Sequence, residues 1–214
     1  MLNLNDISKE IYQVAVEHGW YENEENRNEN VKIALINSEW SEALEEYRAG
    51  RPVVWYGCHN DDLAEHQDCG TEEPGVCDKR FPCAFREKKP EGIMIELIDG
   101  CIRILDFMGF REWTVPEAFD TDEKLMDAAK GAELACFGKP IGAFILPEVV
   151  RWLHFYTSQY GMDEQMKDPM YSLAEAVGLA FVWIKEQGCD PEELLRRKHE
   201  YNKTRPYKHG GKRC

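Results

Sequence analysis

The segment from Ile93 to Met108, IMIELIDGCIRILDFM, restricts the possible folds of this chain more than any other part of it. On a helical wheel, apolar side chains and Gly100 cover nearly the whole circumference. The polar side chains fall in one sector roughly 80° wide. They are Glu96, Asp99, Arg103 and Asp106. A helix that is apolar on all other sides belongs in a core, so this charged stripe must face inward or into a cleft.

This stripe places three carboxylates beside one arginine. Each unpaired buried ion costs several kcal/mol, and a bound divalent cation would offset that cost directly. The alternative is a buried salt-bridge network around Arg103, which could satisfy only part of the charge. The stripe therefore favours a metal site over an ion-pair network.

A second helix, predicted over 30–49, supplies further carboxylates. Its apolar face consists of Ile33, Ile36, Trp40, Ala43, Leu44 and Tyr47. Glu39, Glu42 and Glu46 lie along one flank, because residues three and four apart are neighbours on a helix. We expect Glu39, at the border of the apolar face, to be partly buried, and Glu45 and Glu46 to be solvated. Two antiparallel helices would gather four metal ligands, namely Glu39, Glu42, Glu96 and Asp99.

This set of ligands selects a hard ion. Four oxygen donors without His or Cys suit Mg²⁺, with Mn²⁺ as an alternative. A ferritin-like di-iron site would need Glu-x-x-His, and the chain contains no such motif.

The sequence predicts that the whole chain, 1–214, forms one all-α domain, a helix bundle. Helical patterns lie near 5–18, 30–49, 92–109, 121–136, 141–159, 170–187 and 190–204. VVWY at 53–56 is the only β-like run. A stretch at about 51–90 lacks helical periodicity and reads as an irregular loop insertion that contains cysteines.

The cysteines of this insertion are Cys58, Cys69, Cys77 and Cys83. Four thiolates are the number that a structural zinc site needs, but they include no C-x-x-C pair. Ordinary reduced thiols are therefore favoured, and a structural Zn²⁺ remains the alternative. His59 and His66 could substitute for one ligand.

The charge and hydropathy of the chain exclude two classes of partner. The formal net charge is −14, with 40 acidic and 26 basic residues, which disfavours general nucleic-acid binding. No apolar run approaches the roughly 20 residues that span a bilayer, and the first residues lack the order of a signal peptide. We expect a cytoplasmic protein that does not bind membranes.

The basic residues are concentrated near the C-terminus. Asp190 and Pro191 predict a helix start, with a capping residue followed by proline. Along that helix four residues share one face, namely Lys198, Tyr201, Asn202 and Arg205. The lysine and the arginine could neutralise phosphate oxygens. The alternative is a solvated basic tail.

Three segments in this order, SEWSEALEEYR, IELIDGCIRILDFMG and KHEYNKTRP, resemble the MazG-like branch of the all-α nucleoside triphosphate pyrophosphohydrolases. The resemblance implies Mg²⁺-dependent cleavage of the α–β phosphate bond, which gives a monophosphate and pyrophosphate. Glu39 and Glu42 match the family's first metal-binding pair, and Glu96 and Asp99 match the second. The residues that match K-x-x-Y-N-x-x-R would meet the phosphates of a nucleoside triphosphate substrate. A homodimer or higher homo-oligomer is also implied.

The catalytic base in such a reaction would be Glu39 or Glu42, and the sequence does not separate the ligand from the base. The alternative function is a non-catalytic helical module that binds a nucleotide or a metal, with or without stabilisation by zinc.

Overall fold

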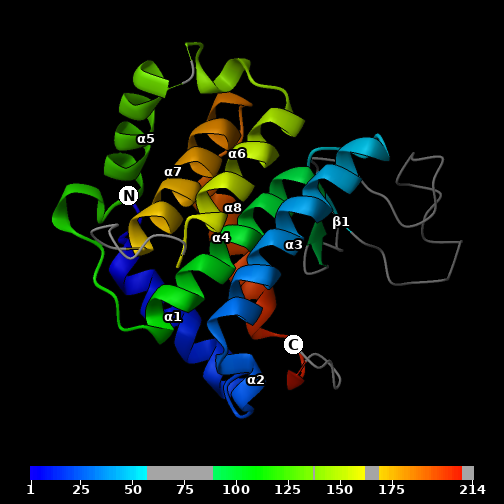
Figure 1. Cartoon of the computed structure of the whole chain (residues 1–214). Coiled ribbons are helices and arrows are strands. Elements are labelled where there is room, and N and C mark those ends of the chain that lie inside the picture. Colours follow the sequence, from blue (N-terminus) through cyan, green and yellow to red (C-terminus); the bar gives the residue numbers. More distant parts are fainter. Residues whose placement is uncertain (57–88, 137, 162–168, 209–214) are drawn as a thin grey trace, which may run out of the picture.

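The structure, a computed structural model, describes residues 1–56, 89–136, 138–161 and 169–208. These ranges hold eight α-helices and one two-stranded sheet (Figure 1), so the predicted all-α fold class is confirmed. The α-helices are Leu4–Glu17 (α1), Glu24–Arg27 (α2), Glu29–Arg48 (α3), Ile93–Phe110 (α4), Asp122–Cys136 (α5), Leu146–Ser158 (α6), Met170–Glu186 (α7) and Pro191–Lys203 (α8). The short 3₁₀ helices are Glu117–Phe119 (η1) and Ile141–Ala143 (η2).

The start of α6 corrects the helix predicted over 141–159. The α-helix begins only at Leu146, after the separate 3₁₀ turn η2. Pro147 gives the reason, because proline has no N–H and is tolerated only in the first turn of a helix. A helix that began at residue 141 would have placed this proline in its interior. The prediction also missed α2, whose four residues are too few to show periodicity.

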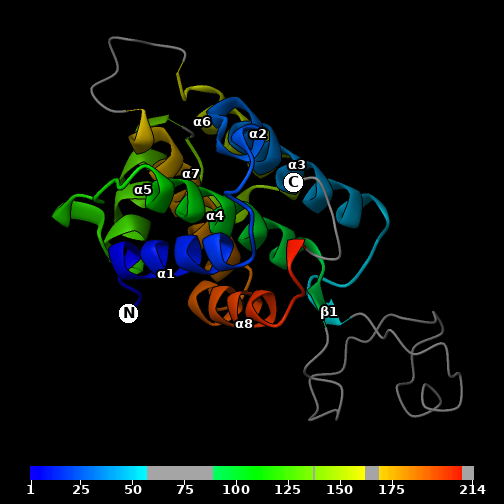
Figure 2. The same ribbon diagram turned by 90° about the horizontal axis from the view of Figure 1, so that it is seen from below.

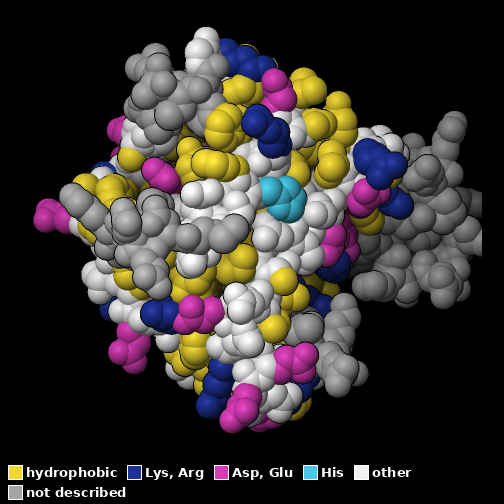
Figure 3. Space-filling view, in the orientation of Figure 1, with side chains coloured by type: hydrophobic (Ala, Val, Ile, Leu, Met, Phe, Trp, Pro, Cys, Tyr) yellow, Lys and Arg dark blue, Asp and Glu magenta, His cyan; other side chains and the backbone are white. Residues whose placement is uncertain are grey.

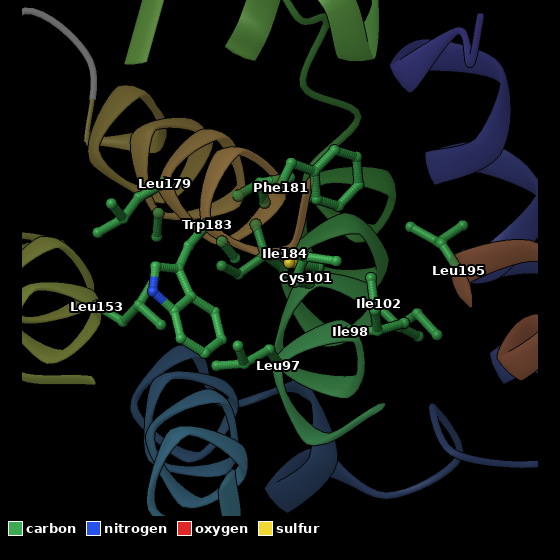
Figure 4. Packing of buried hydrophobic residues seen from close by; sticks show 14 of the residues in the cluster. Leu97, Ile98, Cys101, Ile102, Leu153, Leu179, Phe181, Trp183, Ile184 and Leu195 are labelled. Carbon is green, nitrogen blue, oxygen red and sulfur yellow. The ribbon is translucent and has the colours of Figure 1, made fainter. Parts of the chain in front are cut away.

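The helix α4 is the centre of the bundle. It contacts α1, α3, α7 and α8 (Figures 1 and 2). Figure 4 shows Leu97 and Cys101 of α4 in the same buried cluster as Trp183 and Ile184 of α7. The prediction that this segment is a core helix is therefore confirmed. Its polar stripe is the exception to its apolar surroundings, and this stripe lines the cleft described below.

The described ends of the insertion form the small sheet. Trp55–Tyr56 (β1) pairs antiparallel with Pro90–Glu91 (β2), so the β-like run at 53–56 is confirmed in part. The amide of Met94 donates to the carbonyl of Val53 at 3.0 Å, which fixes the sheet to the first turn of α4. The four cysteines and two histidines considered as zinc ligands fall in 57–88, outside the described residues.

The outer surface carries apolar side chains as well as charges. In Figure 3, hydrophobic side chains gather on the part of the visible face where α6 lies. Exposed Phe155 belongs to α6, and exposed Ile145 immediately precedes it. None of the helices in the described ranges has the length and apolar character needed to cross a bilayer.

Candidate metal centre and cleft

The close approach of α3 to α4 positions the site. Trp40 of α3 is fully buried, and its ring lies where a Cβ at Gly100 would meet it at only 2.1 Å. A larger residue than glycine at this point of α4 would therefore push α3 away. Glu39 and Asp99 are the direct neighbours of these two residues in the sequence. The contact that only glycine allows thus brings carboxylates of both helices to one interface.

Three of the four predicted metal ligands lie together at this interface. Glu39, Glu96 and Asp99 each offer an oxygen atom, and these atoms all lie within 4.8 Å of one another. Glu39 and Glu96 are buried, whereas Asp99 is partly exposed. Glu42 lies on the same cleft but is exposed and does not belong to this cluster. The structure therefore separates the two glutamates of the first predicted pair.

The other residues of α3 differ in part from the predicted pattern. Ile36, Trp40 and Ala43 are buried as expected, but Tyr47 is 45% exposed and does not belong to the apolar face. Glu46, which was predicted to be solvated, is half-buried and accepts a hydrogen bond from the indole N–H of Trp55 at 2.8 Å. The indole lies in β1, so a contact beyond the helix explains this burial.

The carboxylate cluster opens into a cleft of about 270 Å³ between α1, α3, α4 and α8. All four polar residues of the α4 stripe line this cleft, as the helical wheel predicted. The other charged side chains in its wall are Lys32, Glu39, Glu42, Lys89 and Arg205. The cleft also has an apolar part, formed by Ile11, Val14, Ala15, Leu35 and Ile102. It can therefore receive a ligand that has both a charged and an apolar part.

Three cations compensate most of the buried negative charge. Arg103 forms an ion pair with Oε1 of Glu39. Lys198 of α8 lies 2.7 Å from Oδ2 of Asp99. Farther along α4, Lys32 of α3 lies 2.8 Å from Oδ2 of Asp106. The ion-pair network considered as an alternative to a metal site is thus present, and it extends beyond Arg103.

Glu96 is the carboxylate that this network does not satisfy. In the described part of the chain, no Lys or Arg forms an ion pair with it. Burial raises the pKa of Glu96 to about 8, and the negative charges of Asp99 and Glu39 act in the same direction, against Lys198. Burial also raises the pKa of Glu39, although the charge of Arg103 opposes this shift. The cluster therefore holds more carboxyl groups than cations that pair with them, and the raised pKa of Glu96 reflects the cost of ionising this unpaired group.

The donor atoms fit a hard divalent cation. The ion pairs engage one oxygen of Glu39 and one of Asp99, so the second oxygen of each side chain can serve as a ligand. Around six-coordinate Mg²⁺, with oxygens at about 2.1 Å, opposite ligands are about 4.2 Å apart. Small side-chain rotations would bring the oxygens of Glu39, Glu96 and Asp99 from within 4.8 Å to such positions.

The C-terminal helix contributes to the cleft, but not in the way that the sequence predicted for each residue. Asp190 caps α8 by accepting hydrogen bonds from the amides of Glu192 and Glu193, at 3.0 and 3.3 Å. Asn202 and Arg205 line the cleft, whereas Lys198 and Tyr201 do not. Of the four predicted substrate-binding residues, two are therefore placed to meet a ligand.

Lys198 is buried beneath the cleft wall and does not line the cleft as a phosphate-binding residue would. It is 1% exposed, and its ammonium group contacts Asp99 and also donates to the carbonyl of Pro90 at 3.2 Å. It thus joins α8, the small sheet and the carboxylate cluster. In this position Lys198 holds Asp99 in place and neutralises part of its charge.

Arg205 lies just beyond the end of α8 and is half-buried in the cleft wall. Burial lowers the pKa of its guanidinium group. The side chain of His18 at the end of α1 contacts the carbonyl oxygen of Arg205 through Nε2, at 2.9 Å. Nδ1 of the same ring lies 2.8 Å from the carbonyl oxygen of Val14, so the ring bridges two carbonyl groups. The bond fixes the backbone of Arg205 relative to α1.

Several residues of the cleft were not predicted from the sequence. Lys32 precedes Glu39 by seven residues, which is two helical turns, so its position on the same face of α3 could have been found. Asn26 lies in the four-residue helix α2, and Trp20 follows α1, where no periodic pattern indicates which way a side chain points. The sequence offered no sign that these two residues reach the cleft.

Comparisons with known proteins return no match: no protein-family model, no curated protein and no solved structure is significantly similar to this chain.

Proposed function

We propose that this protein is a Mg²⁺-dependent nucleoside triphosphate pyrophosphohydrolase of the MazG-like kind. The reaction would cleave the α–β phosphate bond and release a nucleoside monophosphate and pyrophosphate. One observation carries the proposal: three carboxylates of α3 and α4 meet in a cleft that Arg205 and Asn202 also line. A cation held by these carboxylates, beside the fixed positive charge of Arg205, would suit an anionic nucleotide.

Glu39, Glu96 and Asp99 would hold the ion, and the ion would neutralise phosphate oxygens and polarise the α-phosphorus. Arg103 keeps Glu39 in position, and Lys198 does the same for Asp99. Such partners orient metal ligands and are needed for full metal affinity. Arg205 would hold phosphate oxygens that the ion does not reach, with two parallel hydrogen bonds from its planar guanidinium group.

We assign the role of general base to Glu42. It lines the cleft, is exposed, and has no ion-pair partner within the described ranges. Glu39 is less suited, because its carboxylate is paired with Arg103 and belongs to the cluster. Glu42 would take a proton from the attacking water while the water oxygen forms a bond to the α-phosphorus. The bond from the α-phosphorus to the bridging oxygen then breaks, and pyrophosphate leaves.

The proposal is tested with a panel of ribo- and deoxyribonucleoside triphosphates in ¹⁸O-labelled water containing Mg²⁺. We expect nucleoside monophosphate and pyrophosphate in equal amounts, with the ¹⁸O label in the monophosphate, because water attacks the α-phosphorus. Asp99→Asn protein purified in the same way controls for contaminating enzymes. Release of diphosphate and inorganic phosphate, or no turnover of any nucleotide, would refute the proposal.

A second experiment tests the role of Arg205. Arg205→Ala should lower kcat/KM by about tenfold or more, since a charge-assisted contact to phosphate is lost. Arg205→Lys should restore only part of it, because lysine cannot form the bidentate contact. Lys203→Ala is the matched control, since Lys203 pairs with Glu10 and Glu200 and does not line the cleft.

We further propose that the enzyme acts on free nucleotides in the cytosol as a homodimer or higher homo-oligomer. The acidic charge of −14 supports a small substrate over a nucleic acid. Light scattering coupled to size-exclusion chromatography measures the oligomeric state, and a monomer at micromolar concentration would contradict this part of the proposal.

A further inference from the structure

The cleft also contains buried side-chain atoms that have no hydrogen-bond partner in the described part of the chain. Within the described ranges, the buried side-chain atoms without a hydrogen bond include Nδ2 and Oδ1 of Asn26, Oδ1 of Asp106 and Oδ1 of Asn202. All three residues line the cleft. They come from α2, α4 and α8, which are far apart in the sequence. Unpaired groups from three separate elements thus meet in one cavity.

Asn26 is the most informative of these residues. It is only 5% exposed, and both ends of its amide lack a partner. Buried polar groups in native proteins are nearly always hydrogen-bonded, so each exception calls for an explanation. Exchanging the amide nitrogen and oxygen of Asn26 would not give either atom a partner, because both positions are unpaired. An amide that presents one donor and one acceptor matches a ligand edge with one acceptor and one donor.

Asp106 adds a further acceptor. Its Oδ2 accepts from the hydroxyl of Tyr21 at 2.7 Å and from Lys32 at 2.8 Å, while Oδ1 remains unpaired. Asn202 contributes another unpaired oxygen. Acceptors therefore outnumber donors among the unpaired atoms of the cleft. A complementary ligand has hydrogen-bond donors in excess, as an amino group does.

The apolar lining suits a flat ring. Ile11, Val14 and Leu35 line this cleft together with Trp20. Asp106 follows Asp99 by seven residues, which places it about 10 Å farther along the axis of α4. A ribose with its base can span that separation when its phosphates lie at the carboxylates.

We propose that this part of the cleft binds the nucleobase, that it favours bases with an exocyclic amino group (cytosine, adenine and guanine), and that Asn26 determines this preference. The orientation of the nucleotide rests on the proposed function, whereas the base site itself rests on Asn26, Asp106 and Asn202. On binding, the ring occupies the apolar part of the cleft, and the amino group donates to the unpaired oxygens.

Nucleosides without phosphates test the base site independently of hydrolysis. Calorimetry in EDTA compares cytidine with uridine and adenosine with inosine, pairs in which an oxo group replaces the amino group. The wild type should bind the amino member of each pair on the order of tenfold more tightly, because the amino group brings two hydrogens to the unpaired oxygens, whereas the oxo member places an acceptor there and offers only the ring N–H beside it. Asn26→Leu, which keeps a similar volume, should abolish this difference.

Two controls separate recognition from folding. Asn37→Leu removes a half-buried amide outside the cleft, whose oxygen accepts from Thr157 at 3.0 Å, so the nucleoside preference should persist. Asn26→Leu should not lower the melting temperature, because it removes an amide that has no partner. A large drop in melting temperature would show that the amide is bonded within the protein and would overturn the proposal.

Equal binding of both members of each pair by the wild type, or a preference that Asn26→Leu retains, would also overturn the base site. The two proposals can fail separately. Nucleotide hydrolysis without any effect of Asn26 on base preference would leave the enzyme assignment intact and refute the base site. A nucleoside preference that depends on Asn26, with no hydrolysis of any triphosphate, would support the base site and refute the enzyme assignment.

Discussion

The helices α4 and α7 occupy similar positions in the bundle but differ in what they bury. Both have buried residues along nearly their whole length, and both lie between other helices (Figure 1). The buried residues of α7 include no charged side chain. By contrast, α4 buries Glu96 and carries Asp99, Arg103 and Asp106 on the same stripe. The two helices are thus buried to a similar extent, but only α4 has charged side chains among its buried and half-buried residues.

This difference indicates what the stripe is for. The composition of α7 shows that a helix buried in this bundle needs no charges, and replacing buried ion pairs by apolar residues is often neutral or stabilising. The charges of α4 are thus poorly explained as a source of stability. Their grouping around one cleft agrees with a role in binding, and the predictions below test this interpretation against α7.

The largest effect should come from the carboxylates of α4. Asp99→Asn and Glu96→Gln should each reduce Mg²⁺-dependent hydrolysis on the order of a thousandfold, since a metal supplies several kcal/mol and each 1.4 kcal/mol is about tenfold. The free energy of unfolding without metal should be unchanged or higher for Glu96→Gln, because mutual repulsion is removed, and lower for Asp99→Asn, because buried Lys198 loses its ion-pair partner. Steady-state kinetics and urea unfolding measure the two quantities.

A substitution in α7 should give the opposite result. Leu173 is fully buried, so Leu173→Ala should lower the free energy of unfolding by roughly 2–5 kcal/mol. The activity per folded molecule should stay within about twofold of the wild type, a change of less than 0.5 kcal/mol. Full activity in both α4 variants would contradict the proposed difference between the two helices. A loss of activity per folded molecule in the α7 variant would contradict it too.

The next effect concerns pH. Since the pKa of Glu96 rises from 4.5 to about 8 on folding, the folded state binds more protons than the unfolded state between these values. The free energy of unfolding in EDTA should therefore fall as pH rises from 5 to 8. The expected contribution of this group is roughly 3–5 kcal/mol.

Glu96→Gln should lose this contribution, and saturating Mg²⁺ should reverse it in the wild type by binding the ionised carboxylate. Urea unfolding at several pH values measures both effects. The same pH dependence in the wild type and in Glu96→Gln would show that another group is responsible.

The smallest expected effect comes from replacing one glycine in each helix, Gly100 of α4 and Gly178 of α7. A Cβ at Gly100 of α4 would lie 2.1 Å from the ring of Trp40, whereas at Gly178 of α7 its nearest neighbour would lie at 3.1 Å. Gly100→Ala should destabilise the fold by about 1–3 kcal/mol and also weaken metal binding, because it moves α3 from α4. Gly178→Ala should have little effect on metal binding. Equal metal affinity in both variants would show that metal binding does not depend on the close contact between α3 and α4.

Much of this architecture follows from local patterns, and the main omissions come from long-range contacts. Periodicity predicted the core position of α4 and the direction of its stripe, because a fully apolar circumference leaves a helix few places. The partners of the stripe were harder to predict. Lys198 reaches Asp99 from the last helix, and Asn26 enters the cleft from a helix of four residues. No sequence spacing encodes such contacts, since they depend on how the helices pack.

Calorimetric titration of Mg²⁺ into the metal-free protein measures whether the carboxylates of α4 bind a cation. We expect the wild type to bind Mg²⁺, and Glu96→Gln and Asp99→Asn each to lose this binding. Leu173→Ala, with its substitution in α7, should bind as the wild type does. If the wild type and both α4 variants bind Mg²⁺ with equal affinity, or if the wild type does not bind it, the charged stripe of α4 is not a metal site.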